Sequence, residues 1–450
     1  MPYVHLQGLV GVEASTFRDR KTRQGGARGW NFAHETSAAG AGSSALSPNG
    51  GMRGYTAPEI RRQLLFAGRA ASGESMNATL AIRTGSQMIA AGAVRAGCRF
   101  FAGYPITPAS GIYKSMIDLL QARGDLALGA PDEISALAAC VGASMRGFKA
   151  MTATSGPGWA LMTETVQYAL MTETPVVIAV VQRLGPSTGG ATQGAQGDVL
   201  FVEQCTSGGY TIPVLCPSTA GECYELAMHA FSWAEMLRIP VVLLADKEVA
   251  MTSETVDLGG LCEPRVAERP VPGDDAPASL ATYGFDRLED VPLFFPVGGE
   301  RKVTATGSAH DKRGALRKND PETLDVLLHL EEKIRSRRHD LEIVQHDRRG
   351  GERVLVISYG VTARAMRQAV LDARRAGRHV AGLCVQSLFP VPERALLTAL
   401  EGIERVVVAE ENMNGQYRSV LAPYLAGREI VGVNKVGSMI TPVEIERVCF

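Results

Sequence analysis

Residues 150–182, AMTATSGPGWALMTETVQYALMTETPVVIAVVQ, contain one complete strand–helix–strand pattern. The runs at 150–154 and 175–182 both have the length of a buried strand. Residues 160–170 between them have the length and apolar spacing of a helix, and a Gly-Pro-Gly turn at 156–158 separates this helix from the first strand. Because two strands joined by a helix lie parallel in one sheet, this stretch predicts an α/β fold.

The same alternation extends in both directions over residues 76–256. Further strands are expected at 98–104, 212–216 and 240–246, and further helices at 109–122, 133–146 and 220–236. This order predicts one domain, built on a parallel sheet with helices on both faces.

A second, smaller α/β domain is expected over residues 351–450. Its strands are predicted at 353–360, 379–385, 405–409 and 430–434, and its helices at 363–374 and 415–425. Residues 257–350 are expected to form a connector, because six prolines lie between residues 262 and 296. A charged amphipathic helix is predicted within 320–345 of this connector.

Residues 1–75 differ in composition from the remainder of the chain. They carry nine Lys or Arg against five Asp or Glu, and residues 38–54 are mostly Gly, Ala and Ser. Such a composition buries too little apolar surface to offset chain entropy. We therefore expect 1–75 to be disordered or to come from an upstream start-codon assignment, with Met76 as the natural start.

Composition excludes several classes of function. The 450 residues have a formal net charge of −1, which argues against nucleic acid as the main partner. No purely apolar run is longer than that at 176–181, which is far shorter than the roughly 20 residues of a membrane helix. The eight cysteines contain no C-x-x-C pair, so no zinc or iron–sulfur site is expected in this chain. We expect a cytoplasmic protein with reduced thiols and no metal site of its own.

Two segments that follow predicted strands or precede helices carry polar groups with a possible chemical role. The loop GYPITPAS, which follows the strand at 98–104, holds Thr107 between two prolines. Asp132 is predicted to cap the next helix and leaves Glu133 in its first turn. Taken alone, the first segment also fits an ordinary strand–helix turn, and the second a surface glutamate that complements the helix dipole.

Two more segments follow the strands of the opening stretch. Arg183 comes directly after the strand at 175–182 and begins a glycine-rich loop, and a guanidinium in this position suits a carboxylate or phosphate. The turn TSGPG, which follows the strand at 150–154, opens a helix whose N-terminus could hold an anion. Each of these segments also fits a loop that binds nothing. In open α/β sheets ligands bind where such loops meet, at the carboxyl ends of the strands.

Together the strings GYPITPAS, DEISALAACVGAS, MTATSGPG and QRLGPSTGGATQGAQGDV resemble the α subunit of 2-oxoacid:ferredoxin oxidoreductases, closest to the 2-oxoglutarate type. The resemblance covers nearly all of 76–450, including GSAHDKRG at 307–314 and the terminal TPVEI. It implies that 76–256 is the pyrimidine-binding domain of a thiamine diphosphate enzyme. Residues 351–450 are then a domain similar to the C-terminal domain of transketolase.

The resemblance also implies roles for individual residues. Glu133 matches the glutamate that hydrogen-bonds N1′ of the aminopyrimidine, Thr107 a hydroxyl that faces substrate and cofactor, and Arg183 the arginine that binds the 2-oxoacid carboxylate. The other residues expected around substrate and cofactor are Tyr104, Pro105, Ile106, Ser155, Gly156, Ser187 and Thr188.

The sequence contains only half of the family's active site. No G-D-G followed by an Asn pair is present to bind magnesium and the diphosphate, and no cysteine cluster is present. The resemblance implies that a β subunit shares the thiamine diphosphate and supplies magnesium and a [4Fe-4S] cluster. Coenzyme A is the expected co-substrate and ferredoxin the acceptor, with or without γ and δ subunits. The chain is therefore expected to be active only in a hetero-oligomer.

The predicted reaction is oxidative decarboxylation of a 2-oxoacid, with 2-oxoglutarate favoured, to its acyl-CoA with electrons passed to ferredoxin. Branched-chain 2-oxoacids and pyruvate are alternatives, because Leu184 and the GGATQGAQ run depart from the expected substrate loop. A non-catalytic assembly subunit is a further alternative, and retention of Glu133 argues against it. A general nucleotide-binding module is disfavoured because no G-x-G-x-x-G opens a helix after the first strand.

Overall fold

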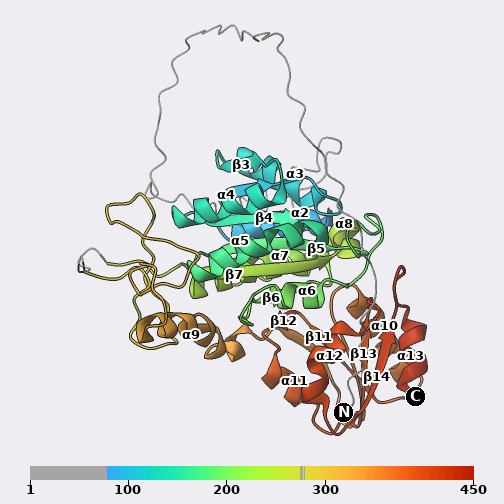
Figure 1. The fold of residues 1–450 in the computed structure, drawn as a ribbon. Helices are drawn as coiled ribbons and strands as arrows, with labels where there is room; N and C mark the ends of the chain where they lie inside the picture. Colours follow the sequence, from blue (N-terminus) through green and yellow to red (C-terminus); the bar gives the residue numbers. More distant parts are fainter. Residues whose placement is uncertain (1–78, 274–276, 278) are drawn as a thin grey trace, which may run out of the picture. The chain divides into compact units, whose positions relative to one another are not determined.

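A seven-stranded sheet, six strands of which come from residues 100–246, forms the centre of the first α/β unit (Figure 1). The computed structural model describes residues 79–273, 277 and 279–450, so the expectation for 1–75 lies outside the described residues. The strands run in the order β12-β6-β7-β5-β4-β2-β3. Their bounds are β2 Phe100–Gly103, β3 Leu126–Gly129, β4 Ala150–Thr154, β5 Val176–Gln182, β6 Val214–Leu215, β7 Pro240–Asp246 and β12 Ser387–Phe389.

Six of these seven strands are parallel, as the sequence predicts. The pairs β2–β3, β2–β4, β4–β5, β5–β7 and β6–β7 are all parallel. Strand β12 comes from the late part of the chain and pairs antiparallel with β6. Strand β3 was not predicted, because it has four residues at the edge of the sheet and its apolar side chains are largely exposed.

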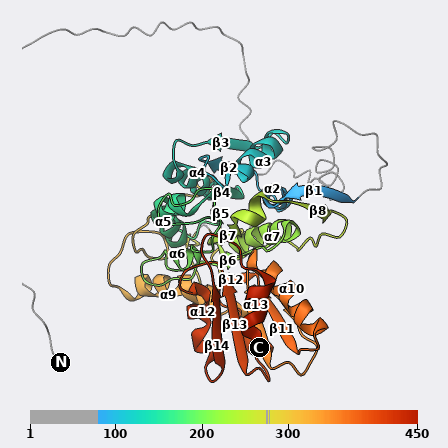
Figure 2. The same ribbon diagram turned by 90° about the vertical axis from the view of Figure 1, so that its right-hand side faces the viewer.

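Helices cover both faces of this sheet, which confirms the predicted α/β architecture. Figures 1 and 2 show α4 and α5 on one face and α2, α3 and α7 on the other. The helices are α2 Gly85–Arg95, α3 Ser110–Gln121, α4 Glu133–Met145, α5 Gly156–Met171, α6 Val199–Glu203, α7 Ala220–Leu237 and α8 Lys247–Met251. Strands β1 Leu80–Thr84 and β8 Ser253–Asp257 form a separate antiparallel pair.

A second sheet has the order β14-β13-β10-β11-β9 and confirms the second βα series. Its strands are β9 Val344–Asp347, β10 Val354–Ser358, β11 Val380–Val385, β13 Arg405–Glu410 and β14 Glu429–Asn434. The accompanying helices are α10 Thr362–Arg375, α11 Glu393–Ala399, α12 Gln416–Leu421 and α13 Pro442–Cys449. Only β9 runs antiparallel to its neighbour in the described part of this sheet. No helix of the described residues is long and apolar enough to cross a membrane.

The predicted amphipathic helix is α9, Pro321–Arg335, and a buried ion pair fixes it to the first sheet's helix layer. Lys333 Nζ lies 2.7 Å from Oε2 of Glu173, which follows α5, and both side chains are fully buried. His329, also on α9, contacts the same oxygen at 3.2 Å. Burial alone would raise the pKa of Glu173, but the Lys333 ammonium holds this pKa well below its usual range.

Because the pair is buried, removing one partner should be costly. We expect Lys333→Met to lower the free energy of unfolding by about 3–5 kcal/mol, since the Glu173 charge is left without its main counter-charge. Urea-induced unfolding followed by circular dichroism measures this loss. The double variant Lys333→Met with Glu173→Gln is the control and should recover part of it. A single-variant loss below about 1 kcal/mol, as for an exposed pair, contradicts the prediction.

Candidate active site

The predicted site residues follow neighbouring parallel strands of the first sheet. Glu133 follows β3, Thr107 follows β2, Ser155 follows β4 and Arg183 follows β5. Since these strands are parallel and adjacent, their carboxyl ends lie at one edge of the sheet. Strand β7, on the other side of β5, ends at the same edge with Asp246.

Glu133 is the first residue of α4 and is placed by the cap that the sequence predicts. The Asp132 side chain accepts a hydrogen bond from the Ser135 N–H at 2.7 Å, so the helix begins at Glu133. The Glu133 side chain is 7% exposed and has no hydrogen-bond partner among the described residues. A buried carboxylate without a partner is costly, so it is a candidate for a ligand contact.

Gly158 leaves the room that Glu133 occupies. A Cβ added to Gly158 would overlap Thr154 Oγ1 and would lie 2.8 Å from Glu133 Oε1. The second glycine of the Gly-Pro-Gly turn therefore allows α5 to begin against the start of α4. The turn helps to shape the site by its lack of a side chain.

Arg183 joins two of the predicted loops. Its Nη1 donates to the carbonyl of Thr107, and its Nη2 donates to the carbonyl of Thr188 at 3.1 Å. The side chain is 6% exposed, and its Nε is buried without a partner among the described residues. The Arg183 side chain thus joins the Thr107 loop to the Ser187–Thr188 segment by hydrogen bonds to a backbone carbonyl of each.

The remaining predicted residues differ in exposure. Tyr104 is 38% exposed, Pro105 and Thr107 are exposed, and Ile106 is partly exposed. Ser187 and Thr188 are also exposed, and Ser187 has a left-handed backbone with φ of 54°. Ser155 and Gly156 are buried at the start of α5, and Ser155 Oγ has no partner within the described residues.

Asp198 lies beside Gly156 and near Arg183, and no sequence pattern predicts it as a site residue. A Cβ added to Gly156 would lie 2.9 Å from Asp198 Oδ2, an enclosed oxygen without a partner in the described part of the chain. Burial raises the pKa of Asp198 to about 6, and the Arg183 charge opposes that shift. In the sequence, an aspartate at the end of a glycine-rich loop looks like a solvated residue, and only its burial distinguishes it.

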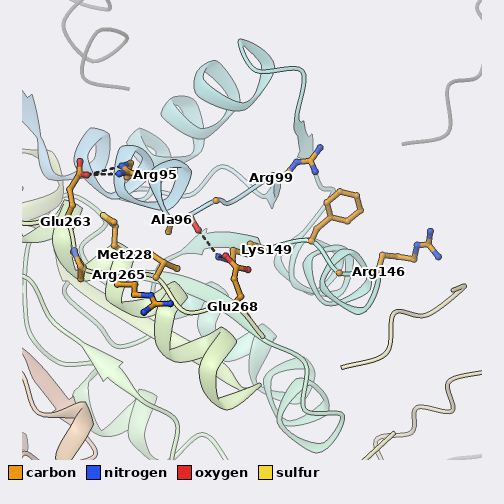
Figure 3. A pocket seen from close by; sticks show the side chains of 14 residues that line it. Arg95, Ala96, Arg99, Arg146, Lys149, Met228, Glu263, Arg265 and Glu268 are labelled. Carbon is orange, nitrogen blue, oxygen red and sulfur yellow. Dashed lines mark hydrogen bonds and ion pairs between the residues drawn. The ribbon is translucent and has the colours of Figure 1, made fainter. Parts of the chain in front are cut away.

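A cavity of about 470 Å³ lies away from these residues (Figure 3). Its lining includes Gly97 and Lys149, which precede β2 and β4, so it lies at the opposite, amino-terminal edge of the sheet. Three of its cations are paired: Arg95 with Glu263 at 2.8 Å, Arg99 with Asp125 at 2.8 Å and Lys149 with Glu268 at 2.7 Å. None of the predicted site residues lines it.

Comparison with known proteins identifies the class of this fold and site. Residues 91–313 match the family model described as the thiamine diphosphate-binding domain of pyruvate flavodoxin/ferredoxin oxidoreductases. Residues 353–440 match the model of pyruvate:ferredoxin oxidoreductase core domain II. Residues 91–313 therefore belong to a thiamine diphosphate-binding α/β domain.

Individual relatives give a narrower assignment. The 2-oxoglutarate synthase subunit KorA of Methanocaldococcus jannaschii is 38% identical over 366 residues, which are 81% of this chain and 97% of the relative. KorA of Archaeoglobus fulgidus is 35% identical, over 80% of this chain and 96% of the relative. The ketoisovalerate oxidoreductase subunit VorB of Methanothermobacter thermautotrophicus is 29% identical, over 78% of this chain and 92% of the relative.

A solved structure agrees with this assignment. The 2-oxoglutarate:ferredoxin oxidoreductase from Magnetococcus marinus, with 2-oxoglutarate, coenzyme A and succinyl-CoA bound, has a TM-score of 0.76 and 26% identity. The match covers 84% of this chain but 66% of that chain, slightly less than two thirds. The chain belongs to the family of 2-oxoacid:ferredoxin oxidoreductase α subunits, which confirms the resemblance seen in the sequence. Its relatives are named as subunits, so it is one component of a multi-subunit enzyme.

Proposed function

We propose that this chain is the α subunit of an enzyme that oxidatively decarboxylates 2-oxoglutarate to its acyl-CoA and passes the electrons to ferredoxin. The buried, unpartnered carboxylate of Glu133 at the carboxyl edge of a parallel sheet carries this proposal. The substrate is supported by the KorA relatives, which are 35–38% identical, against 29% for the ketoisovalerate subunit.

The residues at the carboxyl ends of the parallel strands fit one half of thiamine diphosphate. When bound, this cofactor supplies an electron sink for carbanion chemistry at the oxo carbon. Glu133 would hold the aminopyrimidine by a hydrogen bond at N1′, because the residue is largely buried and its carboxylate makes no hydrogen bond in the described residues. Gly158 and Gly156 let the start of α5 pack closely against Glu133 and Asp198, and Ser155 Oγ has no hydrogen-bond partner in the described residues and could donate to a ligand.

The other predicted residues would bind the substrate. Arg183 would orient the 2-oxoacid carboxylate through its charge, with its unpartnered Nε as a remaining donor. Thr107 would face substrate and cofactor, with Tyr104, Pro105 and Ile106 around it. Ser187 and Thr188 lie on the loop that Arg183 draws toward Thr107 and would close the site on that side.

A second subunit would complete the site. Tyr104 and Ile134 beside it are 38% and 49% exposed, and apolar groups at the rim of a site favour a protein partner. We assign to a β subunit the magnesium–diphosphate half and the [4Fe-4S] cluster, with or without γ and δ subunits. Ferredoxin is the acceptor and coenzyme A the co-substrate. We also propose the domain division 76–256, 257–350 and 351–450.

The test is to co-express the chain with its thiamine-binding partner and to measure coenzyme A-dependent viologen reduction. 2-Oxoglutarate, pyruvate and 2-oxoisovalerate are compared. We expect kcat/KM for 2-oxoglutarate to exceed the others by about tenfold or more, a difference of about 1.4 kcal/mol in transition-state binding. Preference for another 2-oxoacid overturns the substrate. A stable, cofactor-loaded complex without activity on any of them overturns the catalytic assignment.

A further inference from the structure

Two buried glutamines flank the loop that begins with Arg183. Gln182 is the last residue of β5, and Gln196 lies at the far end of the loop, two residues before Asp198. Both side chains are fully buried. Residues 183–195 between them include Ser187 and Thr188 and are mostly exposed or partly exposed.

Both glutamines bind one carboxylate, that of Asp246. Gln182 Nε2 donates to Asp246 Oδ1 at 2.7 Å, and Gln196 Nε2 donates to Asp246 Oδ2 at 3.0 Å. The backbone N–H of Val361 also donates to Oδ2. Asp246 is itself 1% exposed and pairs with Gln182 in the register of β5 and β7. One side chain therefore joins the two ends of the loop.

The orientation of each amide is fixed by its other contacts. Gln182 Oε1 accepts from the Asp198 N–H at 3.3 Å. Gln196 Nε2 also donates to the Tyr359 carbonyl at 3.1 Å, and its Oε1 accepts from Thr362 Oγ1 at 3.0 Å and from the Glu411 N–H at 2.9 Å. Rotating either amide by 180° would oppose like groups, so each must present its N–H groups to Asp246.

Inside the loop the contacts are local. Leu184 N–H donates to the Gln193 carbonyl at 2.9 Å, and Gly190 N–H donates to the Leu184 carbonyl at 2.8 Å. These bonds shape the loop but do not fix it to the sheet. Its position depends on its two ends and on the contacts of the Arg183 guanidinium.

We propose that Asp246 is a positioning residue, whose carboxylate clamps both ends of loop 183–195 and so fixes the direction in which Arg183 is presented to the 2-oxoacid. The proposal rests on the proposed function for the substrate role of Arg183. The Asp246 carboxylate makes no hydrogen bond to Glu133, Thr107 or Arg183 in the described residues; it acts through Gln182 and Gln196.

The decisive variant is Asp246→Asn, which keeps the shape but turns one oxygen into an N–H donor. Whichever way the new amide is oriented, its N–H group opposes a glutamine N–H. In the co-expressed complex we expect KM for 2-oxoglutarate to rise about tenfold or more, with kcat reduced less than about threefold, because positioning rather than chemistry is lost. Amide exchange of peptides covering 183–198, measured without substrate, should become faster by about tenfold.

A pair of double variants separates the clamp from general stability. Adding Gln182→Glu to Asp246→Asn restores every bond: the new amide at position 246 donates to the new carboxylate at position 182, whose second oxygen still accepts from the Asp198 N–H. Adding Gln196→Glu instead leaves the Val361 N–H opposed to the new amide and removes the donor to the Tyr359 carbonyl. We expect the first double variant to recover KM and slow exchange, and the second not to.

Glu352→Gln is the matched control. Glu352 is 3% exposed and accepts from the backbone N–H groups of Arg349 and Gly350, but it lies before β10, far along the chain from the loop. It should change neither KM nor the exchange of 183–198. Unchanged KM and amide exchange in Asp246→Asn overturn the clamp. Recovery of KM by both double variants, or by neither, also overturns it. If Asp246→Asn does not fold, the comparison of the two double variants still applies. A wild-type complex that oxidises no 2-oxoacid overturns the proposed function instead, and the exchange measurement still tests the clamp.

Discussion

The variant Glu133→Gln should lose most turnover, with kcat lowered by about 10²–10⁴-fold, the range expected when a positioned acid–base group is removed. Glutamine preserves the size of the side chain and its place at the start of α4, but its amide cannot share a proton with a ring nitrogen. Since Glu133 is buried and makes no hydrogen bond within the described residues, the fold does not depend on its charge. The measurement is kcat in viologen reduction by the co-expressed complex.

Assembly with the β subunit should be unchanged in this variant, as judged by co-elution on size exclusion. Glu164→Gln is a suitable control, because Glu164 is an exposed carboxylate on α5, the helix that begins beside Glu133. It should leave kcat within about twofold, as is usual for surface substitutions. Near-normal turnover of Glu133→Gln would exclude the role assigned to Glu133.

The second large effect is expected for Arg183→Lys. A lysine ammonium keeps the charge but cannot reproduce the planar fork that contacts the carbonyls of Thr107 and Thr188 together. Loss of one charge-assisted hydrogen bond costs about 1.5–3 kcal/mol, so kcat/KM should fall by about 10- to 150-fold, mainly through KM. Steady-state kinetics over a range of 2-oxoglutarate concentrations measures this split.

Arg146→Lys provides the comparison for this variant. Arg146 also donates to a backbone carbonyl, that of Val297, but it caps the C-terminus of α4, at the far end of that helix from Glu133. Its replacement should leave KM unchanged. If Arg183→Lys also leaves KM for 2-oxoglutarate unchanged, Arg183 does not bind the substrate.

Local sequence signals predict the sheet and the positions of three parts of the candidate site. The apolar run of β5 and the turn at 156–158 place Arg183 and α5, and Asp132 predicts the start of α4 at Glu133. These features are encoded within a few residues, which is why they can be read without a structure. Strand β3 could not be predicted in this way, since a short edge strand with exposed side chains has no distinctive sequence pattern.

The contacts of Asp246 with Gln182 and Gln196, and the burial of Asp198, could not be predicted from the sequence for a different reason. Asp246 contacts Gln182 across 64 positions of the chain, and Gln196 contacts Thr362 across 166. Amide and carboxylate groups at such separations carry no periodicity or motif. Their meaning depends on burial and on which strands become neighbours, and Asp198 was missed for the same reason.

Strand β12 has a consequence for the synthesis of this protein. Residues Ser387–Phe389 complete the outer edge of a sheet whose other strands end by residue 246. During synthesis, the outer edge of β6 therefore stays unpaired after β7 has been translated. It can pair with β12 only after more than 140 further residues, from 246 to 387, have been translated. An uncovered strand edge is a site for pairing with other chains. During that interval this edge of the nascent chain is open to misassembly, and a chain truncated before residue 387 would keep it open permanently.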